Sequence, residues 1–207
     1  MSGSNVTGTL FDVDRIAVMC HKAGFLACFD YAATCPYIDI NMNGPTKWFG
    51  YQDHFMKLSP EDQKLCYKDC IFLSPHKMVG GPGTTGILLA KEKILTFSKP
   101  YRLGGGIVFF VSETDHDFVS DKQEREESGT PGVIQDIRTG LVFQLKDAVS
   151  SKLIMDRDKA IIAKVLPRFK RIKNLCLLGN NAIPKIPIFS FVIKSKNGLL
   201  LHPDFVT

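Results

Sequence analysis

The fold is decided by the stretch Cys70-Ile-Phe-Leu-Ser-Pro-His-Lys-Met-Val-Gly-Gly-Pro-Gly-Thr-Thr-Gly86. Its first residues form an apolar run that ends in a serine, which is the pattern of a strand buried in a sheet. A histidine and a lysine follow, and a glycine-rich segment then leads into a second strand-like run, Ile87-Leu-Leu-Ala90. The stretch therefore predicts a buried strand whose end presents polar, chemically reactive side chains.

Helix and strand patterns alternate on both sides of this stretch. An amphipathic helix is expected over residues 12–22, and the apolar run Phe25–Phe29 predicts another strand buried on both faces. The other expected elements are a turn-rich loop over 34–48, a short helix over 59–68, a long helix after the Thr130-Pro131 cap as far as Ala148, a helix over 157–166 ended by Pro167, and strands over 70–74, 87–90, 107–111, 174–178 and 187–193. This alternation predicts an α/β fold with a mainly parallel sheet flanked by helices.

Composition narrows the class of protein. The 207 residues include 26 Lys and Arg against 21 Asp and Glu, and the net charge of +5 selects no partner. The N-terminus has no signal-like pattern, and no apolar run approaches the ~20 residues that a membrane span needs. Six cysteines form no CxxC pair and lie mostly in apolar runs, as Cys28 and Cys176 do. We expect a cytoplasmic protein with buried thiols and neither a membrane nor a nucleic acid as partner.

One literal motif match conflicts with its surroundings. Gly81-Pro-Gly-Thr-Thr-Gly86 satisfies GxGxxG, which in dinucleotide-binding folds leads from a strand into a helix. Here a strand-like run follows the glycines, and no Lys-Ser/Thr pair completes a P-loop. We therefore interpret the glycines as a tight turn and not as a nucleotide site.

Chemically reactive side chains follow two of the expected strands. Asp30 ends the first strand, and Ser74, His76 and Lys77 follow the second. Ligands of open parallel sheets bind outside the carboxyl ends of the strands, so these residues are expected to share one edge. Pyridoxal phosphate needs an amine for its aldehyde, a carboxylate for its ring nitrogen, and hydroxyl or imidazole groups for its phosphate. The four residues supply that set.

Two other patterns predict weaker alternatives. A basic run near the C-terminal half could contact a nucleic acid, but it has no aromatic platform beyond Phe169 and is typical of a solvated surface. An acidic cluster with one histidine could ligate a metal, although consecutive ligands on an exposed loop are more often only polar. The basic residues are Lys164, Arg168, Lys170, Arg171 and Lys173, and the cluster is Glu113, Asp115, His116 and Asp117.

Three motifs together resemble one enzyme family. They are Phe29-Asp-Tyr-Ala-Ala33, Phe72-Leu-Ser-Pro-His-Lys77 with the glycine turn 80–86, and Arg125-Glu-Glu-Ser-Gly-Thr-Pro131. Their order and spacing are similar to those of class V aminotransferases of pyridoxal-phosphate fold type I, the family of cysteine desulfurases and selenocysteine lyases. The resemblance extends over essentially the whole chain.

The resemblance implies a role for each site residue. Lys77 would form the Schiff base with pyridoxal 5'-phosphate, Asp30 would pair with the pyridine nitrogen, and Ser74 and His76 would hold the phosphate. Thr130 would reach the phosphate of a neighbouring subunit, which implies a homodimer. Ser4-Asn5-Val-Thr-Gly8 is similar to the segment whose asparagine, here Asn5, lies near cofactor and substrate. The substrate would be a small amino acid, cysteine or selenocysteine.

The sequence departs from the family pattern in two ways. The glutamine that desulfurases commonly carry three residues after the ring aspartate is replaced by Ala33. We also find no counterpart of the family's first phosphate loop, its ring-stacking residue, its carboxylate-binding arginine or its mobile-loop cysteine. We therefore expect a central part of a family member, with a partial large domain over 1–150 and the start of a small α+β domain over 151–207. The alternative is a catalytically incompetent fragment that keeps the fold as a binding or structural module.

Overall fold

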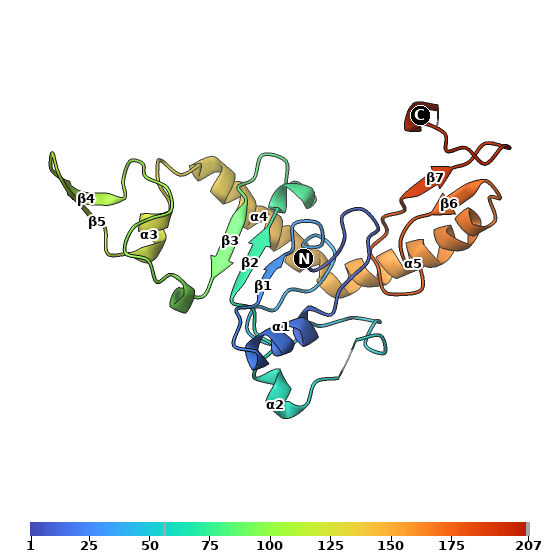
Figure 1. The fold of residues 1–207 in the computed structure, drawn as a ribbon, viewed down its shortest axis with the longest axis horizontal. Coiled ribbons are helices and arrows are strands. Elements are labelled where there is room, and N and C mark those ends of the chain that lie inside the picture. The colour runs from blue at the N-terminus through green and yellow to red at the C-terminus, as the bar shows by residue number, and fades with distance from the viewer. Residues whose placement is uncertain (56, 206–207) are drawn as a thin grey trace.

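The computed structural model describes residues 1–55 and 57–205, and a three-stranded sheet lies at its centre (Figure 1). The strands are β1 (Cys28–Asp30), β2 (Cys70–Leu73) and β3 (Ile87–Ala90), in the order β1-β2-β3. β1 runs parallel to β2, whereas β3 runs antiparallel to β2. The glycine turn is followed by a strand, as expected, and that strand returns beside β2.

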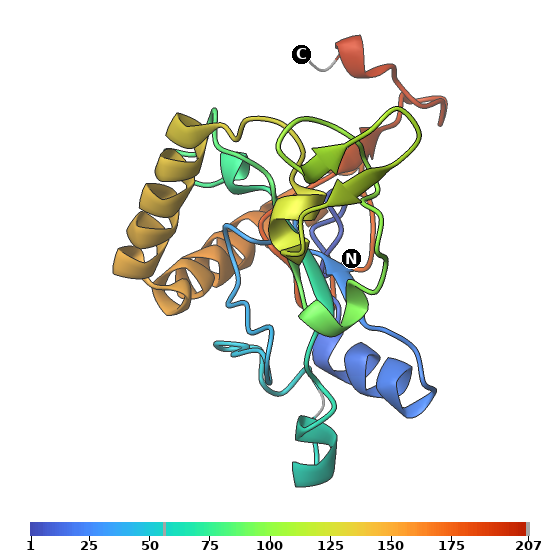
Figure 2. The same ribbon diagram turned by 90° about the vertical axis from the view of Figure 1, so that its left-hand side faces the viewer.

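A long helix, α4 (Val133–Val149), lies against one face of this sheet through Val142 and Phe143. A second, α5 (Ser151–Lys170), follows it after Ser150 and extends toward the other end of the molecule (Figures 1 and 2). Ser150 has a positive φ of 73°, and its side chain accepts a hydrogen bond from the Leu153 amide, so it ends one helix and begins the next. The expected domain boundary coincides with this turn, and the division into two domains stays a prediction.

The hydrophobic core lies between the sheet and the helices. Helix α1 (Val13–Lys22) contributes to it as well, and the Asp12 side chain caps this helix by accepting from the Arg15 amide. Core residues include Val13 and Ala17 from α1, Phe29 from β1, Ile71 and Leu73 from β2, Val142 from α4 and Met155 from α5. Burial of apolar side chains from both sheet and helices is what fixes the strand ends in place.

The opposite face of the sheet is open. Cys28, Asp30, Phe72 and Leu88 all lie on this face, and their side chains are exposed. The expectation of strands buried on both faces is therefore wrong, and so is the placement of Cys28 in the core; Cys176 is half-buried. Continuous apolar runs indicate strands but do not show which of their faces is covered.

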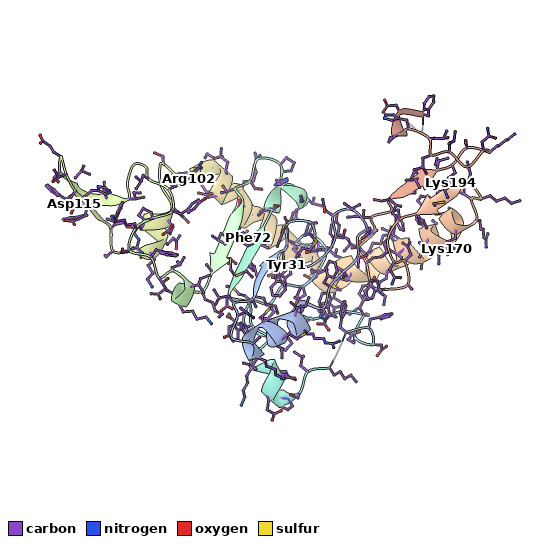
Figure 3. The ribbon with its side chains drawn as sticks, viewed as in Figure 1. Tyr31, Phe72, Arg102, Asp115, Lys170 and Lys194 are labelled. Atoms are coloured by element: carbon purple, nitrogen blue, oxygen red, sulfur yellow. The ribbon has the colours of Figure 1, made fainter. Side chains whose placement is uncertain are left out.

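An arm extends from the central body (Figure 1). It contains the hairpin β4 (Val108–Val111) and β5 (His116–Phe118) and the short helix α3 (Lys122–Glu126). At the other end of the molecule, β6 (Leu175–Leu177) pairs antiparallel with β7 (Phe191–Ile193) beside α5. Figure 3 shows the separation, with Asp115 near the tip of the arm and Lys170 and Lys194 at the other end.

The α/β fold class is confirmed, but several expected details are wrong. One of the four strand pairs in the described residues is parallel, so the sheets are mixed and not mainly parallel: β3, β5 and β7 each return antiparallel to the preceding strand. Pro167 does not end a helix: α5 starts earlier and passes through it to Lys170. The short helix α2 covers only Pro60–Gln63, and the first strand starts at Cys28 instead of Phe25.

None of the helices in the described parts of the chain is long and apolar enough to cross a lipid bilayer.

Candidate functional site

The end of β1 presents Asp30 to solvent. Asp30 lies opposite Phe72 in the parallel register, and the Tyr31 amide donates to the Phe72 carbonyl at 2.9 Å. Figure 3 labels Tyr31 and Phe72 on these two strands. After this point the chain leaves the sheet in a tight turn, in which the Ala32 amide donates to Asp30 Oδ1 at 2.6 Å. The turn holds the carboxylate at the carboxyl end of the strand.

The end of β2 presents the other three predicted residues. The chain enters a single 3-10 turn, Pro75–Lys77, in which the Lys77 amide donates to the Ser74 carbonyl at 3.1 Å. Pro75 is buried and fixes the turn, whereas the side chains of His76 and Lys77 are exposed. The sequence Ser-Pro-His-Lys thus rotates its two basic side chains away from the core.

The glycine segment is required by close backbone packing behind this turn. A Cβ at Gly81 would lie 2.1 Å from the Pro75 carbonyl oxygen, so no larger residue fits there. The segment also attaches to α4, because Arg138 donates to the Pro82 carbonyl at 2.7 Å and the Thr85 amide donates to Thr139 Oγ1 at 3.2 Å. The tight-turn interpretation is consistent with this geometry, and the attachment to α4 was not foreseen.

Cys35 connects the two strand ends. Its Sγ donates to the Ser74 carbonyl at 3.6 Å. Burial raises the pKa of the Cys35 thiol; the Ser74 contact and the positive charges of Lys146 and Lys77 oppose that shift, while the negative charge of Asp30 adds to it. The structure brings the two predicted groups together at one edge of the sheet.

The predicted side chains have few competing interactions. Within residues 1–55 and 57–205, neither Asp30 nor Lys77 forms an ion pair, and neither the Ser74 hydroxyl nor the His76 ring forms a hydrogen bond. The Asp30 carboxylate accepts from the Ala32 amide through Oδ1. An amine, a hydroxyl, an imidazole and the second oxygen of a carboxylate thus remain available at neighbouring strand ends. This donor set fits the aldehyde, ring nitrogen and phosphate of pyridoxal phosphate.

Asn5 belongs to a segment that is anchored beside the same strand end. The amide and the hydroxyl of Ser2 both donate to the Asp30 carbonyl, at 2.8 and 3.0 Å. The Thr7 amide donates to Ser4 Oγ at 3.1 Å, which closes a turn with Asn5 exposed at its tip. Asn5 thus lies three residues along the chain from Ser2, which is hydrogen-bonded to the Asp30 carbonyl.

Thr130 is not brought to this group. It is exposed in the loop between α3 and α4, and among the described residues it has no recorded contact with Asp30, Ser74 or Lys77. A role for Thr130 at the site of its own chain has no support here. Its predicted role toward a second subunit stays a prediction.

Sequence reasoning missed Lys146 as a support of the site. Its Nζ donates to the carbonyls of Cys35 and Ile38, at 2.6 and 2.8 Å, and so holds the turn that follows Asp30. Burial lowers the pKa of Lys146. A lysine among the apolar residues of α4 was the available signal, but its partners lie more than a hundred residues away in sequence and could not be identified from it.

The two weaker alternatives gain no geometric support. In the described part of the chain, no group of three or more His, Cys, Asp or Glu side chains is arranged to hold a metal ion. The cluster around Asp115 lies instead on the exposed turn of the arm, and the basic run lies on the exposed end of α5 and the loop after it.

Residues 57–202 match the sequence profile of a family described as aminotransferase class-V. The chain belongs to this family. Among curated relatives, a cysteine desulfurase of Cronobacter sakazakii is 29% identical over 178 residues, which are 85% of this chain and 38% of the relative. A probable cysteine desulfurase of Borreliella burgdorferi is 24% identical over 93% of this chain and 41% of the relative.

Solved structures of cysteine desulfurases share the fold. The apo cysteine desulfurase of Thermococcus onnurineus superposes with a TM-score of 0.76 at 19% identity, over 99% of this chain and 44% of that one. The cysteine desulfurase CsdA of Escherichia coli gives a TM-score of 0.65 at 21% identity, over 85% of this chain and 38% of that one. The chain thus spans about two fifths of the length of these relatives.

Proposed function

We propose that this chain carries the central cofactor-binding part of a pyridoxal-phosphate enzyme of the cysteine desulfurase and selenocysteine lyase type. The observation that carries the proposal is that Asp30 ends β1 and Lys77 lies in the turn after β2, at the carboxyl ends of two paired parallel strands. The membership of the class V family supports it, because Asp30, Ser74, His76 and Lys77 are the side-chain types that such a cofactor requires.

Each residue has a distinct task in this proposal. Lys77 holds the cofactor through its amine and moves a proton at the substrate's α-carbon. Asp30 keeps a proton on the pyridine nitrogen, and Ser74 and His76 donate to the phosphate. When bound, the cofactor supplies an electron sink for carbanion chemistry on a small amino acid. Ala33 places no donor near the ring oxygen where desulfurases commonly carry a glutamine.

Self-association is the second part of the proposal. The arm exposes several aromatic side chains, with Tyr101 and Phe109 exposed by 95% and 86%, and Thr130 follows the arm directly. An apolar surface of this kind is typical of an interface. We propose that two copies associate through the arm and bring Thr130 toward the partner's site.

Borohydride trapping tests the cofactor assignment. The chain is incubated with pyridoxal phosphate, reduced with borohydride, digested and mapped by mass spectrometry. We expect the label on Lys77 in the wild-type chain and its loss in Lys77→Arg, while the exposed control Lys99→Arg keeps the label on Lys77. A label spread evenly over surface lysines would contradict the proposal.

A turnover assay distinguishes an active enzyme from a catalytically incompetent fragment. If the chain releases sulfide from cysteine, or selenide from selenocysteine, and Lys77→Ala abolishes the release, the alternative of a purely structural module is wrong. Specific labelling of Lys77 without any turnover would instead favour a cofactor-binding fragment that needs further parts of the family fold.

A further inference from the structure

Two cysteines face one another across the parallel strand pair. Cys28 of β1 and Cys70 of β2 are direct register partners, so both side chains project from the same face of the sheet. Neighbouring strands lie roughly 4.8 Å apart, which is within the usual range of about 4.4–6.8 Å between the Cα atoms of a disulfide. In the described sheets no other two cysteines are register partners.

The two thiols have different environments. Cys28 is exposed on the open face of the sheet, whereas Cys70 is buried with 5% of its surface exposed. Burial, followed by the interaction with the Cys28 thiol and the charge of Asp69, together raise the pKa of Cys70 to about 11. The thiols therefore interact directly, and Cys28 is the one that a solution oxidant can reach.

We propose that Cys28 and Cys70 form a redox-sensitive dithiol that peroxides close into a cross-strand disulfide. The exposed Cys28 sulfur attacks a peroxide oxygen and the O–O bond breaks. One water molecule is released, and Cys28 becomes a sulfenic acid. The Cys70 sulfur then attacks the Cys28 sulfur, the S–O bond breaks, and the Cys70 proton leaves with the hydroxide as a second water. Two thiols are oxidised by two electrons, and one hydrogen peroxide is reduced to two waters.

The position of the pair gives the disulfide a structural consequence. Cys28 lies two residues before Asp30 on the same face, and Cys70 lies four residues before Ser74. Closing the bond ties together the two strands whose ends carry the candidate site. Because neither cysteine belongs to that site, the proposal does not depend on the cofactor assignment.

Oxidation followed by alkylation tests the proposal. The chain is treated with a small excess of hydrogen peroxide, its remaining thiols are alkylated under denaturing conditions, and it is mapped without reduction. We expect two of the six thiols to escape alkylation, a mass about 2 Da lower before alkylation, and a peptide that links Cys28 to Cys70. A thiol reductant should restore both thiols.

Two variants assign the roles. In Cys70→Ser, we expect Cys28 to stop at the sulfenic acid and to be captured by dimedone. In Cys28→Ser, Cys70 should stay alkylatable after the same treatment, and the control Cys176→Ser should form the Cys28–Cys70 link as the wild type does. A link between other cysteines, a disulfide between two chains, or full alkylation of both cysteines in the folded wild type would overturn the proposal.

Discussion

The central body and the arm are stabilised in different ways. In the body, Tyr31 and Ile71 are almost completely buried within one continuous core. In the arm, Ile107 is buried and Phe118 is half-buried, but Tyr101, Phe109 and Phe110 are exposed. Arg125 connects the arm's segments by donating to the carbonyls of Phe97 and Val119, at 3.1 and 3.5 Å. The body is therefore stabilised by a large continuous core, whereas the arm buries little apolar surface and exposes aromatic rings that a partner could cover.

Truncating one apolar side chain in each region should reveal the largest difference in stability between the body and the arm. Ile71→Ala in β2 should lower the free energy of unfolding by about 3 kcal/mol, because it leaves a cavity in the core. Phe110→Ala, in β4 of the arm, should change it by less than about 0.5 kcal/mol, because the ring is exposed. Urea denaturation of both variants measures the difference. Equal losses would mean that the arm shares the stability of the core.

Replacing a buried carboxylate in the body should cause the next largest loss in the free energy of unfolding. Asp69 is fully buried; it accepts from the His21 ring and from the Ala27 amide, both at 2.8 Å, and pairs with Lys93 at 2.7 Å. Burial alone would raise the pKa of Asp69, but these donors outweigh it and lower the pKa. Asp69→Asn should cost about 2 kcal/mol at pH 7, because the donors lose the charge that they stabilise.

The pH dependence of Asp69 follows from the direction of its shift. Because the folded pKa is below the unfolded value of about 4, the stabilisation is complete at neutral pH and is lost as the pH falls below that value. Denaturation of wild type and Asp69→Asn at pH 7 and pH 3 checks this. A gap between the two proteins that stays as large at pH 3 would show that the charge is irrelevant.

The contribution of Asp158 on α5 to stability should depend on pH in the direction opposite to that of Asp69, and by a smaller amount. It is buried, one of its oxygens has no partner among the described residues, and burial raises its pKa to about 6. The folded state then binds the extra proton, so stability falls as the pH rises from about 4 toward 7. Asp158→Asn should raise the free energy of unfolding by about 1 kcal/mol at pH 8 and leave it unchanged at pH 4.

Denaturation at both pH values, with Asp147→Asn as an exposed control on α4, checks this expectation. The control should shift stability by a few tenths of a kcal/mol at most and equally at both pH values. A loss of stability in Asp158→Asn at pH 8 would mean that the carboxylate has a partner that only the charged form satisfies.

Removing apolar surface from the arm should have the smallest effect on folding. Tyr101→Ser combined with Phe109→Ser should leave the free energy of unfolding within about 0.5 kcal/mol of wild type, while weakening self-association in sedimentation velocity experiments. Exchange of two exposed body residues, Phe25 and Leu26, for serine is the matched control. Equal association of the arm variant and the wild type would exclude the arm as the contact between copies.

The candidate site was more predictable than the surfaces around it. Local signals locate strand ends, so Asp30 and Lys77 could be placed on one edge from the sequence. The periodic residues Ile137, Leu141 and Leu145 predicted the long helix correctly, yet they are exposed and α4 buries Thr139 and Val142 instead. Periodicity identifies a helix and an apolar side, but the surface that covers this side is a property of the whole assembly and not of the local sequence.

Titration of the purified chain with pyridoxal phosphate, followed by visible absorbance, tests whether these strand ends form a cofactor site. We expect a saturable band, distinct from that of free cofactor, at one equivalent per chain. The band should be absent in Lys77→Ala and altered in Asp30→Ala, because the amine and the carboxylate act on the same ring. Identical spectra for wild type and Lys77→Ala would contradict the claim that these strand ends form a cofactor site.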